Sequence, residues 1–413
     1  MGDTELTRLP GGLRVVTRRL PGARAASVGA WIGVGSRDES PARSGTSHFL
    51  EHLLFKGTRT RSAHDLAVAV DSVGGEMNAF TTRELTAYYA RVPGVAVGAA
   101  TEMLLDVVTD PLIDADDVES ERAVILDEIR VSTDEPEDRA QTLLYESLFP
   151  ADPLGRDVGG SVDTVEALTR DEIAEFHHAN YRRGTVVVAA AGAVDHDAIV
   201  EQAERSFGPV SSGTTPSRVA PPPETTVGTV EHRDLEEVHL VLGWRGFGHH
   251  DPDRHALAVG SQLLGGGLSS RLFQEVREKR GLAYSIFSSP VHFSDSGAFV
   301  IATGTSPQRV DEVMKVIESE VADVAGGGVT ETEVEIAKRF LEGSTELAFE
   351  DSWSHLSHIA HSVTSRDRVV DIGEYLDAIR AVTVDDVNRV LGTMLAAEPS
   401  VTSVGPIAGA GPD

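Results

Sequence analysis

The sequence contains no cysteine among its 413 residues. Disulfide bonds, thiolate nucleophiles and cysteine-ligated zinc are therefore excluded, and any metal site must use histidine, aspartate or glutamate. Long apolar runs are also missing, so we expect no transmembrane helix and no membrane partner. The N-terminal region has scattered arginines and no apolar block of the kind that directs export, which predicts a cytoplasmic protein.

Basic residues are scarce relative to acidic ones. The chain has 36 Lys and Arg against 65 Asp and Glu, so its formal net charge is -29. A protein of this charge is repelled by phosphate backbones, which argues against nucleic acid as a partner. The length exceeds what one hydrophobic core normally organises, and this predicts two or more domains.

A break in composition divides the chain nearly in half. Residues 211–226 read SSGTTPSRVAPPPETT, and three consecutive prolines beside Ser and Thr favour an extended linker. We therefore predict an N-terminal domain at 1–210, a linker at 211–226 and a C-terminal domain at 227–413.

The two halves show strands and helices in the same order. An apolar strand at 27–35 precedes a helix around His48, and an apolar strand at 238–246 precedes a helix around His255. The correspondence continues through five elements, which favours an internal duplication over a chance likeness between two α+β domains.

The segment with most chemical information is 47–55, SHFLEHLLF. His48 and His52 are one helical turn apart on the same face, so both imidazoles can reach one zinc ion. Glu51 flanks that face, and a carboxylate there can take a proton from a water molecule that zinc has made more acidic. A helix with two solvent-facing histidines is the alternative, so a third ligand is needed to favour a metal site.

Two glutamates on a later helical segment are candidates for the third ligand. In 117–130, DVESERAVILDEIR, Glu121 and Glu128 are seven residues apart and project on nearly the same side. Either carboxylate could complete a His, His, Glu set with one position open for water. The spacing does not choose between them, and a lone pair of this kind is more often a solvated acidic face.

Three segments together resemble the zinc peptidases of the pitrilysin and mitochondrial processing peptidase family, which carry the inverted His-x-x-Glu-His motif. They are SHFLEHLLFKGT at 47–58, GGEMNAFTTRELTAYYARV at 74–92 and ERAVILDEIR at 121–130. The segment GGGLSSRLFQEVREKRGLAYS at 265–285 extends the likeness into the second half. The resemblance implies an α+β fold of two homologous domains, each a largely antiparallel β-sheet flanked by helices. It also implies zinc-dependent hydrolysis of peptides or unfolded segments in an enclosed chamber.

The resemblance implies roles for individual residues of the first half. His48, His52 and Glu128 would bind one zinc ion per chain. Glu51 would be the general base, and Glu121 would be an acidic residue that orients one of the ligands without binding the metal.

The resemblance also places Asn78, Ala79 and Phe80 on a strand whose edge pairs with an extended substrate. Without it, an ordinary turn into the following strand would be the preferred interpretation of these three residues.

The second half lacks the matching metal ligands. When His255 is aligned with His48, Ala258 takes the position of the base and Val259 that of the second histidine. Ser344 falls near the position of Glu128. We therefore expect one zinc site per chain.

Arg277 and Tyr284 match an arginine and a tyrosine that, in the family, contact the substrate near the scissile bond from a C-terminal domain. A tyrosine hydroxyl there can stabilise a developing oxyanion. The chain has half the length of single-chain members yet carries both the zinc motif and this pair. We therefore expect a homodimer that closes like a clamshell, with the pair completing the partner's site.

Two alternatives stay open at this stage. One is a heterodimer with a metal-free homologue. The other is a non-catalytic subunit that binds peptides or scaffolds a larger assembly, although the intact zinc set argues against it.

Overall fold

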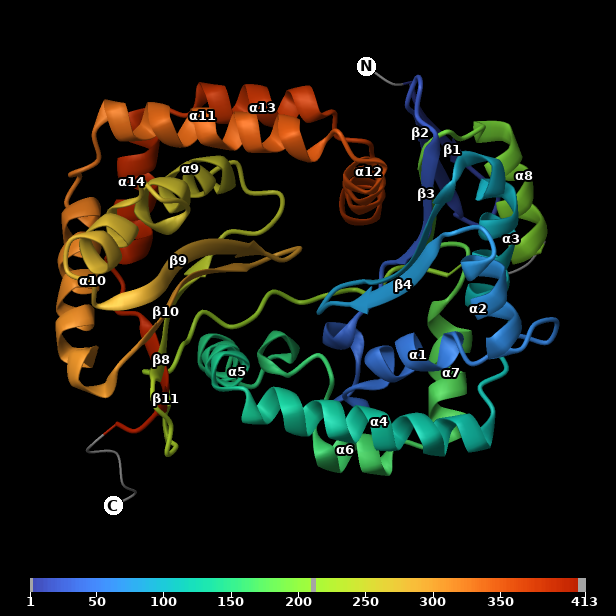
Figure 1. Cartoon of the computed structure of the whole chain (residues 1–413), viewed down its shortest axis with the longest axis horizontal. Helices are drawn as coiled ribbons and strands as arrows, with labels where there is room; N and C mark the ends of the chain where they lie inside the picture. The colour runs from blue at the N-terminus through green and yellow to red at the C-terminus, as the bar shows by residue number, and fades with distance from the viewer. Residues whose placement is uncertain (1–2, 209–212, 408–413) are drawn as a thin grey trace. The chain divides into compact units, whose positions relative to one another are not determined.

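The structure, a computed structural model, describes residues 3–208 and 213–407 and divides into two compact units (Figure 1). Unit 1 is made of Met1–Ile129, Asp157–Arg218 and Leu347–Val370. Unit 2 is made of Arg130–Arg156, Val219–Glu346 and Asp371–Asp413. Residue 210 and the first two residues of the predicted linker lie outside the described residues.

The sheet of unit 1 has six strands in the order β1-β2-β6-β3-β5-β4. The strands are β1 (Thr4–Arg8), β2 (Arg14–Arg19), β3 (Ala25–Ile32), β4 (Glu76–Thr81), β5 (Thr86–Pro93) and β6 (Val186–Gly192). β2 and β6 run parallel, and all other neighbours in this sheet run antiparallel. β4 pairs with β5 alone, so its other side is an edge of the sheet.

Helices cover both faces of this sheet. They are α1 (Thr46–Leu54), α2 (Ala63–Asp71), α3 (Val97–Thr109), α4 (Ala115–Asp134), α6 (Val162–Ala167), α7 (Arg170–Asn180), α8 (His196–Phe207) and α12 (Ser352–Arg366). The central strand β6 reads VVVAAAG and is buried throughout. Val186 and Val188 join the core beneath α1 and α3, whereas Val187 and Ala189 join the core beneath α12. A strand buried on both faces needs this uninterrupted apolar sequence.

The sheet of unit 2 has five strands in the order β7-β11-β8-β10-β9. The strands are β7 (Val230–His232), β8 (Val238–Gly246), β9 (Ala283–His292), β10 (Gly297–Thr305) and β11 (Ser400–Gly405). The helices are α5 (Pro136–Leu148), α9 (Arg254–Gly265), η5 (Phe273–Glu278), α10 (Val310–Ala325), α11 (Glu331–Ala348), α13 (Ile372–Ala381) and α14 (Val384–Leu395). α11 begins in unit 2 and ends in unit 1.

The two sheets share one topology. The order β2-β6-β3-β5-β4 matches β7-β11-β8-β10-β9 strand for strand, and in each sheet the one parallel pair lies at the same end. The predicted fold class is confirmed: the chain is α+β with two alike, largely antiparallel sheets flanked by helices. The clamshell dimer stays a prediction.

Each half of the sequence contributes one helix to the unit that is formed mainly by the other half. α5, from the first half, lies against β8 and β11, whereas α12, from the second half, lies against β2, β3 and β6 (Figure 1). The ring of Trp353 of α12 lies against that of Tyr89, with centroids 4.0 Å apart and ring planes tilted by 37°. The domain boundaries 1–210 and 227–413 stay a prediction. The two compact units do not coincide with these ranges, because each unit contains a helix from the other half of the sequence.

Among the described residues, no helix is both long enough and apolar enough to cross a membrane.

The exchange predicts that α12 stabilises unit 1. Leu356 of α12 is completely buried against the sheet of that unit, so Leu356→Ala should lower the free energy of unfolding by about 2–5 kcal/mol. Val95→Ala is the control, because Val95 is fully exposed and its loss should cost no more than about 0.5 kcal/mol. Urea unfolding measures both, and equal midpoints for the two variants would contradict the predicted packing role.

Candidate metal centre

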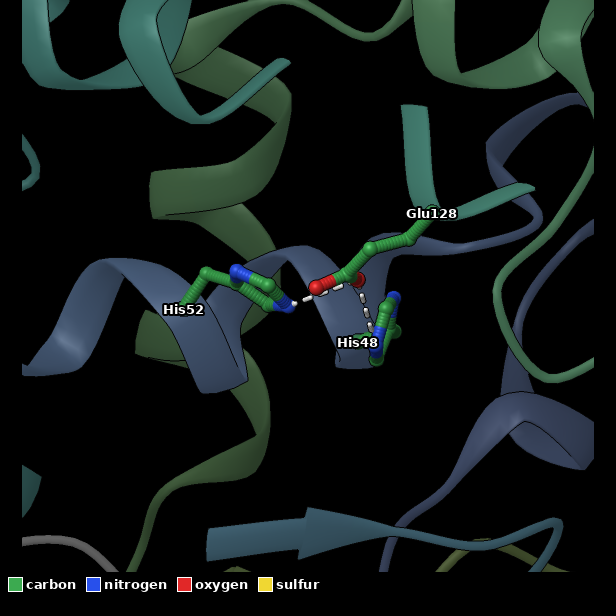
Figure 2. A group of neighbouring side chains, drawn as sticks. All are labelled: His48, His52 and Glu128. Carbon is green, nitrogen blue, oxygen red and sulfur yellow. Dashed lines mark ion pairs between the residues drawn. The ribbon is translucent and has the colours of Figure 1, made fainter. Parts of the chain in front are cut away.

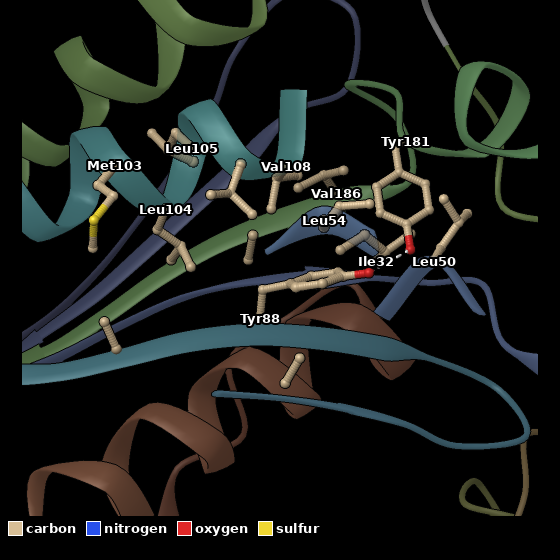
Figure 3. Close-up of a cluster of buried hydrophobic side chains, with 14 of the residues drawn as sticks. Ile32, Leu50, Leu54, Tyr88, Met103, Leu104, Leu105, Val108, Tyr181 and Val186 are labelled. Atoms are coloured by element: carbon tan, nitrogen blue, oxygen red, sulfur yellow. Dashed lines mark hydrogen bonds between the residues drawn. The ribbon is translucent and has the colours of Figure 1, made fainter. Parts of the chain in front are cut away.

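The helix α1 has two chemically distinct faces. Phe49, Leu50, Leu53 and Leu54 are completely buried and pack against the core of unit 1. Figure 3 shows Leu50 and Leu54 among these core side chains. The remaining face carries His48, Glu51 and His52, whose side chains stay partly accessible. Burial of one face therefore fixes which way the polar face points.

The third polar group comes from α4. Glu128 Oε2 lies 3.3 Å from His52 Nε2 and 3.8 Å from His48 Nε2. Figure 2 shows the Glu128 carboxylate directed at both imidazoles. Among the described residues, these three form the one cluster of His, Asp or Glu suited to a metal ion, with ligand atoms within 4.8 Å of one another.

This arrangement fits zinc. In a tetrahedral site with bonds of about 2.0–2.2 Å, the ligand atoms lie roughly 3.3–3.6 Å apart, and the two distances from Glu128 to the histidines, 3.3 and 3.8 Å, are close to this. Two imidazoles and one carboxylate are a donor set that zinc accepts, and they leave a fourth position for water or substrate. The side chain of Glu128 is half-exposed, so the cluster is accessible to solvent.

His48 has the protonation state that a metal ligand requires. Burial, together with the neighbouring imidazole of His52, lowers the pKa of His48 to about 4, and the carboxylate of Asp157 opposes the change. The ring is therefore neutral near pH 7, and a neutral imidazole has the lone pair that binds a cation.

Glu121 lies behind His52 and outside the ligand cluster. Its Oε2 is 3.1 Å from His52 Nδ1, and its Oε1 forms an ion pair with Lys56 at the end of α1. When Nδ1 donates its hydrogen to Glu121, Nε2 keeps its lone pair for a metal. The side chain of Glu121 is only 8% exposed, against 50% for Glu128. The geometry thus separates the two glutamates that sequence spacing left equivalent.

Glu51 is held by a residue of β4. Thr81 Oγ1 donates a hydrogen bond of 2.6 Å to Glu51 Oε2. Burial raises the pKa of Glu51 above its ordinary value, although the bond from Thr81 lowers it. A carboxylate with a raised pKa accepts and returns protons more readily near neutral pH.

Asn78, Ala79 and Phe80 lie on β4, the edge strand of the sheet. Phe80 packs its ring against Trp31 and Tyr89, so its side chain belongs to the core beneath α12. Asn78 Oδ1 accepts a hydrogen bond from the N–H of Ala79 at 2.8 Å. Their strand position agrees with the prediction, and their role in substrate binding stays a prediction.

Arg277 and Tyr284 belong to unit 2 and lie against each other. The Arg277 guanidinium carbon is 4.8 Å from the centroid of the Tyr284 ring, which is a cation–π contact. Tyr284 is 81% exposed, so its hydroxyl is accessible to a ligand. Their predicted contact with a substrate stays a prediction.

The corresponding helix of unit 2, α9, has no such cluster. His255 Nε2 is 2.8 Å from a guanidinium nitrogen of Arg254, and its ring lies beside Tyr375. Val259, aligned with His52, is completely buried. The part of the chain described in the structure thus offers no second group of ligands in unit 2.

Sequence reasoning missed two residues of the site, Thr81 and Lys56. Thr81 lies in a run of ordinary strand residues, and Lys56 looks like a helix-ending surface lysine. Each gains its role through a partner distant in sequence, which no local pattern reveals.

Comparison with protein families gives two matches that together span most of the chain. Residues 14–161 match the model described as insulinase, peptidase family M16. Residues 167–341 match the model described as peptidase M16 inactive domain.

Several curated relatives are similar over nearly the full chain. An uncharacterized zinc protease of Streptomyces coelicolor is 44% identical, with 98% of this chain and 90% of the relative covered. One from Mycobacterium leprae is 45% identical, with 97% and 92% covered. One from Bacillus subtilis, named YmxG, is 31% identical, with 96% of each covered.

Solved structures show the same fold. A structure described as the peptidase M16 inactive domain from Pseudomonas fluorescens superimposes with a TM-score of 0.90 at 21% identity, covering 99% of this chain and all of the other. A protease from Helicobacter pylori also gives a TM-score of 0.90, at 24% identity, covering 98% and 99%.

The geometry predicts different effects for the two glutamates of α4. Glu128→Ala should no longer retain about one zinc ion per chain, because the substitution removes a ligand. Glu121→Gln should keep the stoichiometry but weaken zinc binding about 10–100-fold, because an uncharged amide has one acceptor oxygen for both His52 and Lys56 and orients the imidazole less strongly. Glu119→Gln, which changes an exposed glutamate bonded to Arg122 on the same helix, is the control and should bind zinc normally. Metal analysis after dialysis and chelator competition measure these effects, and identical behaviour of the Glu121 and Glu128 variants would contradict the assignment.

Proposed function

Because the chain belongs to peptidase family M16, the insulinase family, we propose that it is a zinc-dependent endopeptidase that hydrolyses peptides or unfolded protein segments. The observation that carries this proposal is the convergence of His48, His52 and Glu128, with the carboxylate of Glu51 on the same helix face. We propose one Zn2+ per chain, since unit 2 lacks the ligands among its described residues.

Bound zinc would supply Lewis-acid chemistry, acidifying water and polarising a peptide carbonyl. The protein contributes the proton transfers. Glu51, held in place by Thr81, takes a proton from the attacking water and passes it to the nitrogen of the leaving amine. Its raised pKa suits both steps, because the group must bind the proton and then release it.

The edge of β4 would hold the substrate. Its backbone groups on the side away from β5 pair with no other described strand of the sheet. An extended peptide can pair there without regard to its sequence once it displaces the local bond between the N–H of Ala79 and Asn78 Oδ1. Asn78, Ala79 and Phe80 would act in this way through their backbone. Such binding requires an unfolded segment, which limits the substrates to peptides and unstructured chain.

The pair Arg277 and Tyr284 would complete the site. The exposed Tyr284 hydroxyl can donate a hydrogen bond to the oxyanion that develops as the carbonyl is attacked. We propose that the pair acts in a homodimer on the partner's metal centre, enclosing the substrate in a chamber. A heterodimer with a metal-free homologue is the alternative. A cytoplasmic location remains a prediction from the sequence.

The assigned base predicts a separation of metal binding from catalysis. Glu51→Gln should leave zinc content near that of the unmodified chain, because Glu51 is not a ligand. Cleavage of an unstructured peptide should fall by at least about 100-fold, because the amide cannot take the proton. Zinc analysis and a fluorogenic peptide assay, with chelator-treated protein as the metal-free reference, measure both. Turnover close to that of the unmodified chain would rule out Glu51 as the base.

The proposed sharing of sites predicts complementation between inactive variants. Glu51→Gln chains and chains with both Arg277→Ala and Tyr284→Phe should each be inactive alone. A mixed dimer contains one site with an intact base and an intact partner pair. It should therefore recover up to about half of the activity of the unmodified dimer, which has two such sites. The assay uses dimers isolated by two different affinity tags, and full inactivity of such dimers would count against action in trans.

A further inference from the structure

The helix that carries the two histidines begins without a cap of its own. Gly45, its N-cap residue, adopts a left-handed conformation with φ of 96° and has no side chain to accept the first N–H groups. Gly45 and Ser47 are both buried, so water cannot readily serve as the acceptor. Buried N–H groups at a helix start are costly unless another group bonds them.

The carboxylate of Glu39 is that acceptor. Its Oε2 accepts the N–H of Gly45 at 2.7 Å, and its Oε1 accepts the N–H of Ser47 at 2.6 Å. Glu39 is only 5% exposed, and a buried anion at a helix N-terminus is stabilised by charge-assisted bonds and by the helix dipole. Because each oxygen bonds a different backbone amide, the carboxylate restrains both the position of α1 along its axis and its rotation about that axis.

The rotation of α1 matters because the metal ligands come from two helices. His48 directly follows Ser47, and His52 lies one turn later, whereas Glu128 is on α4. A rotation of α1 about its axis would carry both imidazoles sideways while leaving Glu128 in place. The three ligand atoms can therefore bind one metal ion only at one rotation of α1 about its axis.

The turn that carries Glu39 is itself fixed by a residue of the predicted linker. Arg218 Nε and Nη2 bond the two oxygens of Asp38 at 3.0 and 2.7 Å. The same Nη2 donates to the backbone carbonyl of Glu84 at 2.7 Å. The Asp38 side chain is 2% exposed and that of Arg218 is 14% exposed, so this pair is shielded from solvent and salt.

We propose that Glu39 is a positioning residue for the metal centre: together with the buried apolar face, its carboxylate sets the rotation of α1 and its position along the helix axis, and Arg218 fixes the turn from which Glu39 reaches that helix. This inference rests on the proposed function only in requiring that His48, His52 and Glu128 bind zinc. According to this inference, Glu39 and Arg218, which lie outside the zinc motif, affect the affinity for the metal.

The test compares Glu39→Gln with Asp195→Ala. Glutamine keeps the size of the side chain, but its amide group cannot accept from a second backbone N–H. We expect the affinity for zinc, measured by competition with a chromophoric chelator, to fall about tenfold or more. Asp195 caps α8 by accepting the N–H of Ala198, so Asp195→Ala removes a helix cap of the same unit without touching α1. It should lower the melting temperature and leave zinc affinity unchanged.

Zinc affinity of Glu39→Gln equal to that of the unmodified chain would overturn the proposal. An equal loss of affinity in Asp195→Ala would do so too, because general destabilisation would then explain both. If Glu39→Gln does not fold, Arg218→Lys replaces it: lysine keeps the charge but cannot reproduce the two parallel bonds to Asp38 together with the bond to the carbonyl of Glu84, and a loss of a few-fold in affinity is expected. Unchanged affinity in that variant would then overturn the proposal.

These measurements separate the inference from the proposed function. None of them uses peptide cleavage. A chain that binds zinc in a manner dependent on Glu39 yet cleaves no peptide would refute the peptidase and support the positioning role. A chain that binds no zinc would refute both.

Discussion

The metal centre depends on one short helix having an apolar face that is locked into a core. α1 spans nine residues, too few to be a stable helix alone, so tertiary packing has to stabilise it. Its leucines and Phe49 lie in the same cluster as Tyr88 and Tyr181, whose hydroxyls bond each other at 3.0 Å beneath it (Figure 3). With that face fixed, its histidines have little freedom, and a metal ion would find them already oriented. Much of the ordering cost of binding is met during folding.

Unit 2 has the same sheet topology but no cluster of metal ligands among its described residues. Its sheet has the same strand order, and α9 occupies the place of α1 in the sequence of elements. Where the alignment puts His52, α9 has Val259, which is completely buried. The fold thus tolerates either a ligand or a core residue at that position, because the inner face of the helix supplies the stability. The packing of this helix on its sheet therefore does not depend on a metal site.

The sequence predicted most of what is local. The strand at 238–246 was placed at its observed bounds, and the helix around His48 followed from motif and periodicity. The strand that carries Asn78, Ala79 and Phe80 followed only from the family resemblance, since the residues alone favoured a turn. The exchange of α5 and α12 was not predicted, because an amphipathic helix shows that it has a buried face but not which sheet will cover it. Spacing also left Glu121 and Glu128 equivalent, since the difference between them is one of depth. The family resemblance chose Glu128 as the ligand, and the packed structure gives the physical difference: Glu121 is 8% exposed and bonds His52 Nδ1, whereas Glu128 is 50% exposed and faces Nε2.

The exchange of helices has a consequence for how the protein is made. The sheet of unit 1 is covered on one face by α12, so the ribosome must synthesise the chain to about residue 370 before that face can be closed. At typical synthesis rates, the stretch between 210 and 370 takes on the order of ten seconds. During this time Trp31, Val187 and Ala189 lack the cover that α12 later provides. The nascent N-terminal half is therefore a natural client for chaperones that bind apolar surface.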